Sequence, residues 1–105
     1  MDDEKLMNCI GFQWDHGNIN KNQVKHQVSH IECEQIFLNS PLLLYPDEKH
    51  SEHEDRYFAL GITDNGRELF VCFTVRSDLI RIISARDMNR KEGKAYEQSK
   101  KDTKI

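Results

Sequence analysis

The sequence predicts an α+β domain with the element order β-α-α-β-β-β-β-α, in which helices cover one side of an antiparallel sheet. Segments with helical patterns come before residue 40 and after residue 86, and the segments between them have the composition of strands. Tight-turn residues at 64–66 and 76–78 join three consecutive strands into a meander. Because helices and strands are segregated along the chain, the α+β class is favoured.

The first part of the chain predicts one strand and two helices. Residues 10–14 place Ile, Phe and Trp on one face by the two-residue period of a strand. Asp15 is suited to cap a polar surface helix over residues 16–26. Ser29 and Glu32 have the spacing of a capping box, so a second helix is expected to begin there and to end at the following Asn-Ser-Pro.

Four strands and a last helix follow. The strands are expected over residues 42–45, 57–62, 69–75 and 79–85. The Asp-Asn-Gly sequence at 64–66 favours a hairpin because Asn and Gly tolerate positive φ. The last two strands are apolar on both faces, which predicts a central position in the sheet. A charged helix is expected over residues 88–100.

The length of 105 residues fits one domain. We expect a flexible start over residues 1–9, a single domain over 10–100 and a frayed tail over 101–105. The longest apolar runs, residues 40–45 and 69–75, are far shorter than the roughly 18 residues of a membrane helix. The first residues lack the basic start of a signal peptide, so a cytoplasmic protein that does not contact the membrane is expected.

The three cysteines, Cys9, Cys33 and Cys72, are widely spaced and lie in apolar contexts. Buried free thiols are therefore expected, rather than a disulfide framework or a CxxC metal site. His50 and His53 lie in one acidic loop without a Cys partner, which is a weak metal signal that we interpret as a solvated loop. No glycine-rich phosphate loop is present in the sequence, and neither a metal nor a cofactor is expected.

The charge is distributed unevenly along the chain. The formal net charge is −3, which argues against a nucleic-acid partner. Residues 1–75 carry 6 Lys and Arg against 13 Asp and Glu, whereas residues 76–105 carry 9 against 5. Because local potential steers an anionic ligand more than total charge does, a basic face on this acidic protein is possible.

Several cations lie beside or within apolar strands. Arg81 interrupts the last strand, Arg86 ends it, and Arg56 begins an earlier strand. A guanidinium on a half-buried sheet needs an anion, and either an acidic side chain or a phosphate would satisfy it. Lys25 and His26 end the first predicted helix, where a cation is favoured by the helix dipole, although a solvated lysine is the ordinary alternative.

Together these groups meet the chemical needs of RNA strand cleavage. Attack of a ribose 2′-hydroxyl on its phosphate requires a proton acceptor, a proton donor and cations that stabilise the developing charge. His26, Glu54 and Tyr96 are candidates for proton transfer, and the sequence does not decide which group is the base.

At the level of motifs the chain resembles the BrnT toxins. The resemblance covers about residues 10–97 and rests on short motifs in a specific order. They are Phe12-x-Trp14-Asp15, Lys25-His26-x-Val28-Ser29, Phe37, His50-Ser51-x-x-Glu54-x-Arg56, Gly61, Ile80-Arg81-Ile82-Ile83-Ser84-Ala85-Arg86, Glu92 and Tyr96-Glu97.

The resemblance implies a RelE-like fold and a metal-independent endoribonuclease that stops translation. By motif position, the residues expected at or near the RNA site are Lys25, His26, Glu54, Arg56, Arg81 and Arg86. The implied partner is a BrnA-type antitoxin with a ribbon-helix-helix end, which would form a heterotetramer of two toxins and two antitoxins. DNA would be contacted only through that antitoxin.

Two alternatives stay open at this point. A toxin-like fold that has lost catalysis would act as a binding module, either as a co-repressor or as a decoy for the antitoxin. Inhibition of DNA gyrase, which occurs in some relatives of this superfold, ranks last because no local sequence feature selects it.

Overall fold

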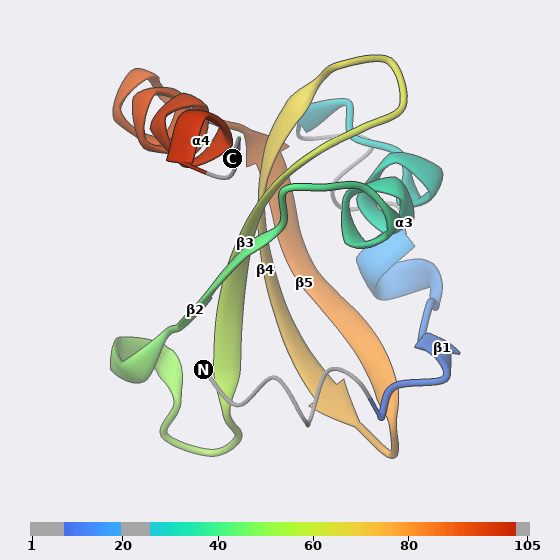
Figure 1. Ribbon diagram of the computed structural model, residues 1–105. Coiled ribbons are helices and arrows are strands. Elements are labelled where there is room, and N and C mark those ends of the chain that lie inside the picture. The colour runs from blue at the N-terminus through green and yellow to red at the C-terminus, as the bar shows by residue number, and fades with distance from the viewer. Residues whose placement is uncertain (1–7, 20–25, 103–105) are drawn as a thin grey trace.

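A five-stranded sheet forms the centre of the computed structural model, which describes residues 8–19 and 26–102 (Figure 1). The strand order across the sheet is β1-β5-β4-β3-β2. The elements are β1 (Gly11–Phe12), α3 (His30–Leu38), β2 (Leu43–Pro46), the 3-10 helix η1 (Glu48–His50), β3 (Arg56–Ile62), β4 (Glu68–Arg76), β5 (Leu79–Asp87) and α4 (Arg90–Asp102). Residues 16–19 are also helical.

The predicted α+β class and element order are confirmed. Of the helix predicted over residues 16–26, residues 20–25 lie outside the described part of the chain. The capping box is present as predicted: the Ser29 hydroxyl accepts from the backbone N–H of Glu32, and the Glu32 carboxylate accepts from the backbone N–H of Ser29. Ser77 and Asp78 both have positive φ and form the tight turn between β4 and β5.

The direction of one strand differs from the predicted antiparallel sheet. β2, β3, β4 and β5 pair antiparallel, but β1 pairs parallel with β5, where Gly11 lies opposite Leu79 and Phe12 opposite Ile80. The sheet is therefore mixed. Short turns fix the direction of the meander strands, whereas no hairpin joins β1 to β5, so local sequence does not determine how they pair.

The main core lies between α3 and one face of the sheet. The fully buried side chains there include Ile36 of α3, Phe73 of β4 and Ile82 of β5. α3 approaches β3 so closely that a Cβ at Gly61 would lie 2.7 Å from the Cβ of Ile36. Gly61 therefore allows the helix to pack directly on the strand.

α4 lies on the opposite face of the sheet, so the prediction that the helices cover one side is wrong in this respect (Figure 1). Tyr96 of α4 is fully buried and its hydroxyl donates to the backbone oxygen of Pro41 at 2.5 Å. On the same face Leu60 of β3 is only 4% exposed. A helix can pack on either face of strands that are apolar on both faces. Sequence periodicity therefore does not predict which face each helix covers.

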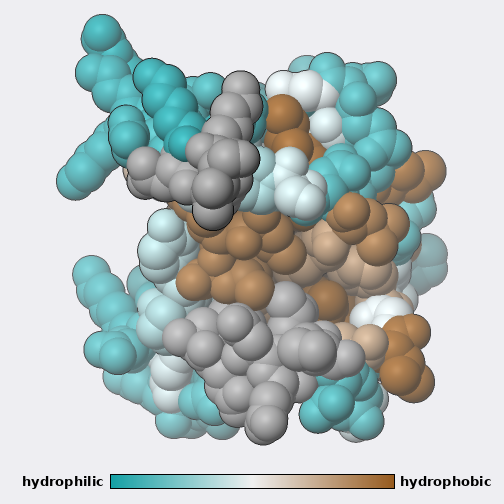
Figure 2. Space-filling view, in the orientation of Figure 1, coloured by the Kyte–Doolittle hydropathy of each residue, from teal (hydrophilic) through white to brown (hydrophobic). Residues whose placement is uncertain are grey.

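α4 and η1 lie toward the two ends of the same side of the sheet (Figure 1). On the view from the β2 edge, hydrophobic residues gather over β2 and the segment leading into it, next to the hydrophilic α4 (Figure 2). Among the described helices, none is long and apolar enough to span a membrane. Cys9, Cys33 and Cys72 are free, as predicted, although only Cys33 is fully buried.

Candidate functional site

The sheet surface between α4 and η1 contains two adjoining cavities, which we call the groove. The larger has a volume of about 430 Å³, and the smaller about 230 Å³. Arg56 lines both. The larger cavity extends toward η1 and includes Asp47, His50, Phe58, Phe70 and Cys72, and the smaller includes Glu54, Arg76 and Arg81. The groove therefore joins an aromatic floor to a group of arginines.

Three arginines, Arg56, Arg76 and Arg81, form an arginine cluster at one end of the groove. Strand register brings them together, because Thr74 of β4 lies opposite both Arg56 of β3 and Arg81 of β5. Side chains at opposed positions of neighbouring strands lie on the same face of the sheet. The meander thus collects cations that are 25 residues apart in sequence at Arg56 and Arg81.

Two carboxylates partly neutralise the arginine cluster. Both oxygens of Glu54 accept from Arg76, each at 2.8 Å, and Asp15 accepts from Arg81 at 3.0 Å. The hydrogen bond from Arg76 lowers the pKa of Glu54, and the hydrogen bond from Arg81 lowers the pKa of Asp15. Both carboxylates are therefore held in the charged form, and Glu54 becomes a weaker proton acceptor than an ordinary glutamate.

Arg56 is held through its backbone and not through a carboxylate. Its N–H donates to the hydroxyl of Ser51 at 3.0 Å, and its carbonyl accepts from the N–H of Asp47 at 2.8 Å. Among residues 8–19 and 26–102, no ion pair joins its guanidinium to a carboxylate. Glu54, two residues before Arg56, binds Arg76 instead. Arg56 presents a positive charge that an anion in the groove can neutralise.

Arg86 lies at the α4 end of the groove, about 16 Å from Arg81 along β5 at the usual strand rise of about 3.3 Å per residue. Its guanidinium donates to both oxygens of Glu92, at 2.8 and 2.9 Å, and lies 4.1 Å from the ring centroid of Phe70. The hydrogen bonds from Arg86 lower the pKa of Glu92. Arg86 is therefore satisfied within the protein and anchors α4 to β5.

A row of aromatic rings forms the floor between Arg86 and η1. The ring centroids of Tyr45 and Phe58 are 4.9 Å apart, and those of Phe58 and Phe70 are 5.2 Å apart, both in stacked arrangements. The rings stack on one another across strands β2, β3 and β4. Their partly exposed edges make the groove floor apolar next to its cationic end.

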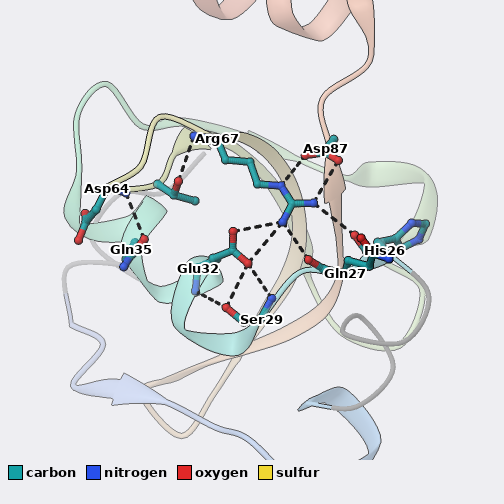
Figure 3. A network of polar contacts seen from close by, with 9 residues as sticks. His26, Gln27, Ser29, Glu32, Gln35, Asp64, Arg67 and Asp87 are labelled. Atoms are coloured by element: carbon teal, nitrogen blue, oxygen red, sulfur yellow. Dashed lines mark hydrogen bonds and ion pairs between the residues drawn. The ribbon is translucent and has the colours of Figure 1, made fainter.

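His26, one of the predicted site residues, does not line the groove. Lys25 lies outside the described residues. His26 precedes α3, and its carbonyl accepts from Arg67 at 3.3 Å while its imidazole points away from that arginine (Figure 3). The same guanidinium binds Asp87 and Glu32, so His26 belongs to a network on the α3 side of the sheet. The structure does not bring His26 together with Arg56.

Tyr96 has a structural role. Its side chain is fully buried, and burial raises the pKa of the hydroxyl to about 12. The hydroxyl donates to the Pro41 carbonyl and does not face the groove. Tyr96 therefore fixes α4 against the segment that enters β2 and is unsuited to proton transfer.

The described His, Cys, Asp and Glu residues include no group of three or more placed to hold a metal ion. His50 instead contacts a single carboxylate, that of Asp47, at 3.0 Å. The acidic loop around His50 and His53 thus contributes one histidine–carboxylate pair to the edge of the groove.

A comparison with known protein families tests the resemblance to the BrnT toxins that the sequence motifs indicate. The family described as ribonuclease toxin, BrnT, of type II toxin–antitoxin system matches residues 14–92, which is more than half of the chain. The chain belongs to the BrnT family. No match was found among curated proteins.

Membership of the BrnT family means that the relatives are ribonuclease toxins with an antitoxin partner and RNA as substrate. The match includes all residues of the arginine cluster and the whole β3-β4-β5 meander. All the residues that line the groove lie within the matched segment.

Sequence reasoning missed four residues of the groove: Asp15 as an ion-pair partner, Arg76, Asp47 and His50. The sequence predicts Arg76 only as a turn residue, and the β3–β4 register, in which Arg56 lies opposite Thr74, is what brings it close to the start of β3. In the sequence, His50 is a weak candidate for a metal ligand and part of a motif shared with the BrnT toxins, but neither pattern assigns it to the RNA site. Asp47, three residues before His50, is the signal that a helical turn would bring the two side chains together.

Proposed function

We propose that this protein is an endoribonuclease toxin that cleaves RNA in the groove and thereby inhibits translation. The observation that carries the proposal is the arginine cluster on an open face of the sheet, in which Arg56 makes no ion pair with the described residues. Arg76 and Arg81 each pair with a carboxylate, whereas the Arg56 guanidinium makes no ion pair among the described residues and can donate to a phosphate. Arginine is well suited to this role because its planar donors match phosphate oxygens.

The reaction we propose is attack of the ribose 2′-hydroxyl on the adjacent phosphate. Arg56 would bind the phosphate directly, with Arg81 and Arg76 adding positive potential as the negative charge grows on the phosphoryl oxygens. Glu54 acts in this proposal as the counterion that orders Arg76. Arg86 and Phe70 form the far wall, along which the RNA strand would continue. Cations supplied by side chains suit a reaction that needs no metal ion.

The proposed partner is a BrnA-type antitoxin with a ribbon-helix-helix end. We propose that two toxins and two antitoxins form a heterotetramer, in which DNA is contacted only by the antitoxin. Support comes from the toxin–antitoxin character of the BrnT family. The net charge of −3 fits a basic partner.

The test is cleavage of a single-stranded RNA by the purified protein, with and without a chelator, together with growth arrest on expression. We expect cleavage in both buffers. Arg56→Ala is expected to lower the cleavage rate by about 10²–10³-fold, which is typical for removal of one group that stabilises the transition state. Its thermal unfolding midpoint should be unchanged, because the Arg56 side chain makes no ion pair among the described residues.

Arg81→Ala is the companion variant, and we expect it to lose cleavage as well while it keeps the fold. Lys94→Ala, on the exposed surface of α4, is the matched control and should cleave like the parent. An Arg56→Ala protein that is as active and as toxic as the parent would contradict the assignment of the groove. Cleavage that disappears with chelator would contradict metal independence.

One observation favours the second candidate, an inactive binding module. Arg76, Arg81 and Arg86 already have carboxylate partners within the protein, so they need no RNA to be satisfied. If the parent protein leaves RNA intact in both buffers and does not arrest growth, this module becomes the better interpretation.

A further inference from the structure

The turn containing η1 places a histidine and a carboxylate side by side at the edge of the groove. Asp47 contacts Nδ1 of His50 with both oxygens, at 3.1 and 3.0 Å. The Asp47 side chain is 19% exposed and that of His50 is 58% exposed. The carboxylate is thus mostly covered, whereas the imidazole reaches solvent at the mouth of the larger cavity.

The Asp47 carboxylate does not act as an ordinary helix cap. Asp47 occupies the N-cap position of η1, where an aspartate usually accepts from backbone N–H groups of the first turn. Here the side chain makes no capping hydrogen bond. Its direction toward His50 is therefore not explained by capping of the short helix.

The backbone around Asp47 holds this carboxylate in place. Its N–H donates to the carbonyl of Arg56 at 2.8 Å, and its carbonyl accepts from the hydroxyl of Ser51 at 2.7 Å. Ser51 in turn accepts from the N–H of Arg56. The same three hydrogen bonds thus fix Asp47 and Arg56 relative to each other, and both residues line the larger cavity.

The contact between Asp47 and His50 defines which ring nitrogen of the imidazole carries a proton. An ionised carboxylate only accepts hydrogen bonds, so Nδ1 of His50 must carry the proton that it donates to Asp47. In the neutral imidazole this leaves Nε2 unprotonated and able to accept a proton. A carboxylate that orients a histidine in this tautomer is the arrangement that activates hydroxyl nucleophiles in other enzymes.

We propose that Nε2 of His50 is the general base of the RNA cleavage reaction, with Asp47 as its positioning residue. The proposal rests on the proposed ribonuclease function. His50 takes the proton of the ribose 2′-hydroxyl, the O2′ electron pair forms a bond to phosphorus, and the bond from phosphorus to O5′ breaks. The leaving O5′ takes a proton from solvent, and His50 later returns its proton to solvent. The products are a 2′,3′-cyclic phosphate and a 5′-hydroxyl.

The other candidates for this step are less suitable. Glu54 is engaged by Arg76 through both oxygens, and Tyr96 is buried against Pro41. His26 lies beside the Arg67 network on the α3 side of the sheet. Glu54 also lines a cavity with Arg56, but its carboxylate is bound by Arg76, whereas His50 lines the larger cavity and its imidazole is both oriented by Asp47 and exposed to solvent.

The test uses the full-length protein and a short single-stranded RNA. His50→Ala is expected to lower the cleavage rate by about 10²–10⁴-fold, the usual contribution of a general base, while RNA affinity and the unfolding midpoint are kept. Added imidazole is expected to restore part of that rate, because the His50 site is open to solvent. A purely structural histidine would not be rescued in this way.

Two further variants complete the experiment. Asp47→Asn is expected to lower kcat with KM unchanged, because it disturbs the tautomer of His50 and not the binding of phosphate. Lys94→Ala, on the exposed surface of α4 and outside the groove, is again the control, and it should cleave like the parent.

The two proposals fail in different ways. If the parent cleaves RNA and His50→Ala cleaves at the same rate, or if imidazole restores none of the lost rate, His50 is not the base although the ribonuclease function stands. If the products carry a 5′-phosphate, attack by the 2′-hydroxyl is excluded. The assignment of His50 as the general base is then contradicted as well. A parent protein that does not cleave RNA overturns the proposed function itself.

Discussion

Arg67 on the α3 side of the sheet and the arginine cluster in the groove have opposite relationships to their anions. On the α3 side, Arg67 donates to Asp87 at 2.6 and 3.1 Å, to Glu32 at 3.1 Å, and to the carbonyls of His26 and Gln27 (Figure 3). One guanidinium there meets two carboxylates and two carbonyls. In the groove, three guanidinium groups share two carboxylates, and Arg56 has none among the described residues.

The difference shows that the number of acceptors around an arginine separates a structural role from a binding role. Arg67 ties the β3-β4 hairpin to the end of β5 and to the N-terminus of α3, and no donor capacity is left for a ligand. The arginine cluster has more positive charge than its partners neutralise, on a surface that is open to solvent. Both sites are built from arginine, so the residue type alone does not distinguish the structural role from the binding role.

The largest expected effect on stability comes from Arg67. Arg67→Met leaves Glu32 and Asp87 without their cation, and we expect the free energy of unfolding to fall by about 2 kcal/mol, toward the low end for a broken ion pair because Asp87 is largely solvated. For a domain of this size that corresponds to about 10 °C in the unfolding midpoint. Arg56→Met is the matched control and should unfold like the parent. Equal midpoints for the two variants would contradict the comparison.

The second prediction concerns the stability of the fold at acidic pH. The hydrogen bond from Arg67 lowers the pKa of Asp87 below its usual 3.8. Partial burial opposes the shift at Glu32, but hydrogen bonds from Ser29 and Arg67 lower its pKa below 4.5. A lowered folded-state pKa stabilises the fold above the unfolded value, and this stabilisation is lost as the pH falls through the folded value.

The difference in unfolding midpoint between the parent and Arg67→Met should therefore be constant between pH 7 and pH 5 and should narrow below about pH 4. Thermal unfolding of both proteins across this range measures it. A gap that stays constant down to pH 2.5 would show that Arg67 stabilises the fold through packing and not through its carboxylate partners.

The smallest expected effect comes from Glu54. Glu54→Gln removes the negative charge that neutralises Arg76, so we expect RNA to bind about threefold more tightly and the salt dependence to steepen by about 0.7 in log–log slope. Fluorescence anisotropy with a labelled RNA at several salt concentrations measures both. A cleavage rate that falls by a hundredfold or more would contradict the counterion role and assign proton transfer to Glu54.

Much of the fold was predictable because its signals are local. The capping box at Ser29, the Asp-Asn-Gly turn and the β-branched last strand each depend on residues that are close in sequence. The placement of α4 was not predictable in the same way, since β3 carries apolar side chains such as Leu60 and Ala59 on both faces. Nor does local sequence set the parallel pairing of β1 with β5.

The sequence predicted the kinds of residue at the candidate site better than it predicted which individual residues belong to the site. Arg56, Arg81 and Glu54 were expected at the site, and the structure brings them to one cavity. His26 was expected there too, but its carbonyl contact with Arg67 holds its backbone on the α3 side. Arg76 was missed, because only the register of β3, β4 and β5 shows that the end of β4 meets Glu54.

The elements, their order, the family membership and the residue types available for phosphate binding all follow from the amino-acid sequence, because they depend on short-range patterns. The carboxylate that each arginine meets, and the direction of Asp47 toward His50 and not toward the backbone of η1, follow only from the folded chain. Those outcomes depend on strand register and on distances between segments far apart in the chain, and pairing of charges depends on distance through space rather than along the sequence.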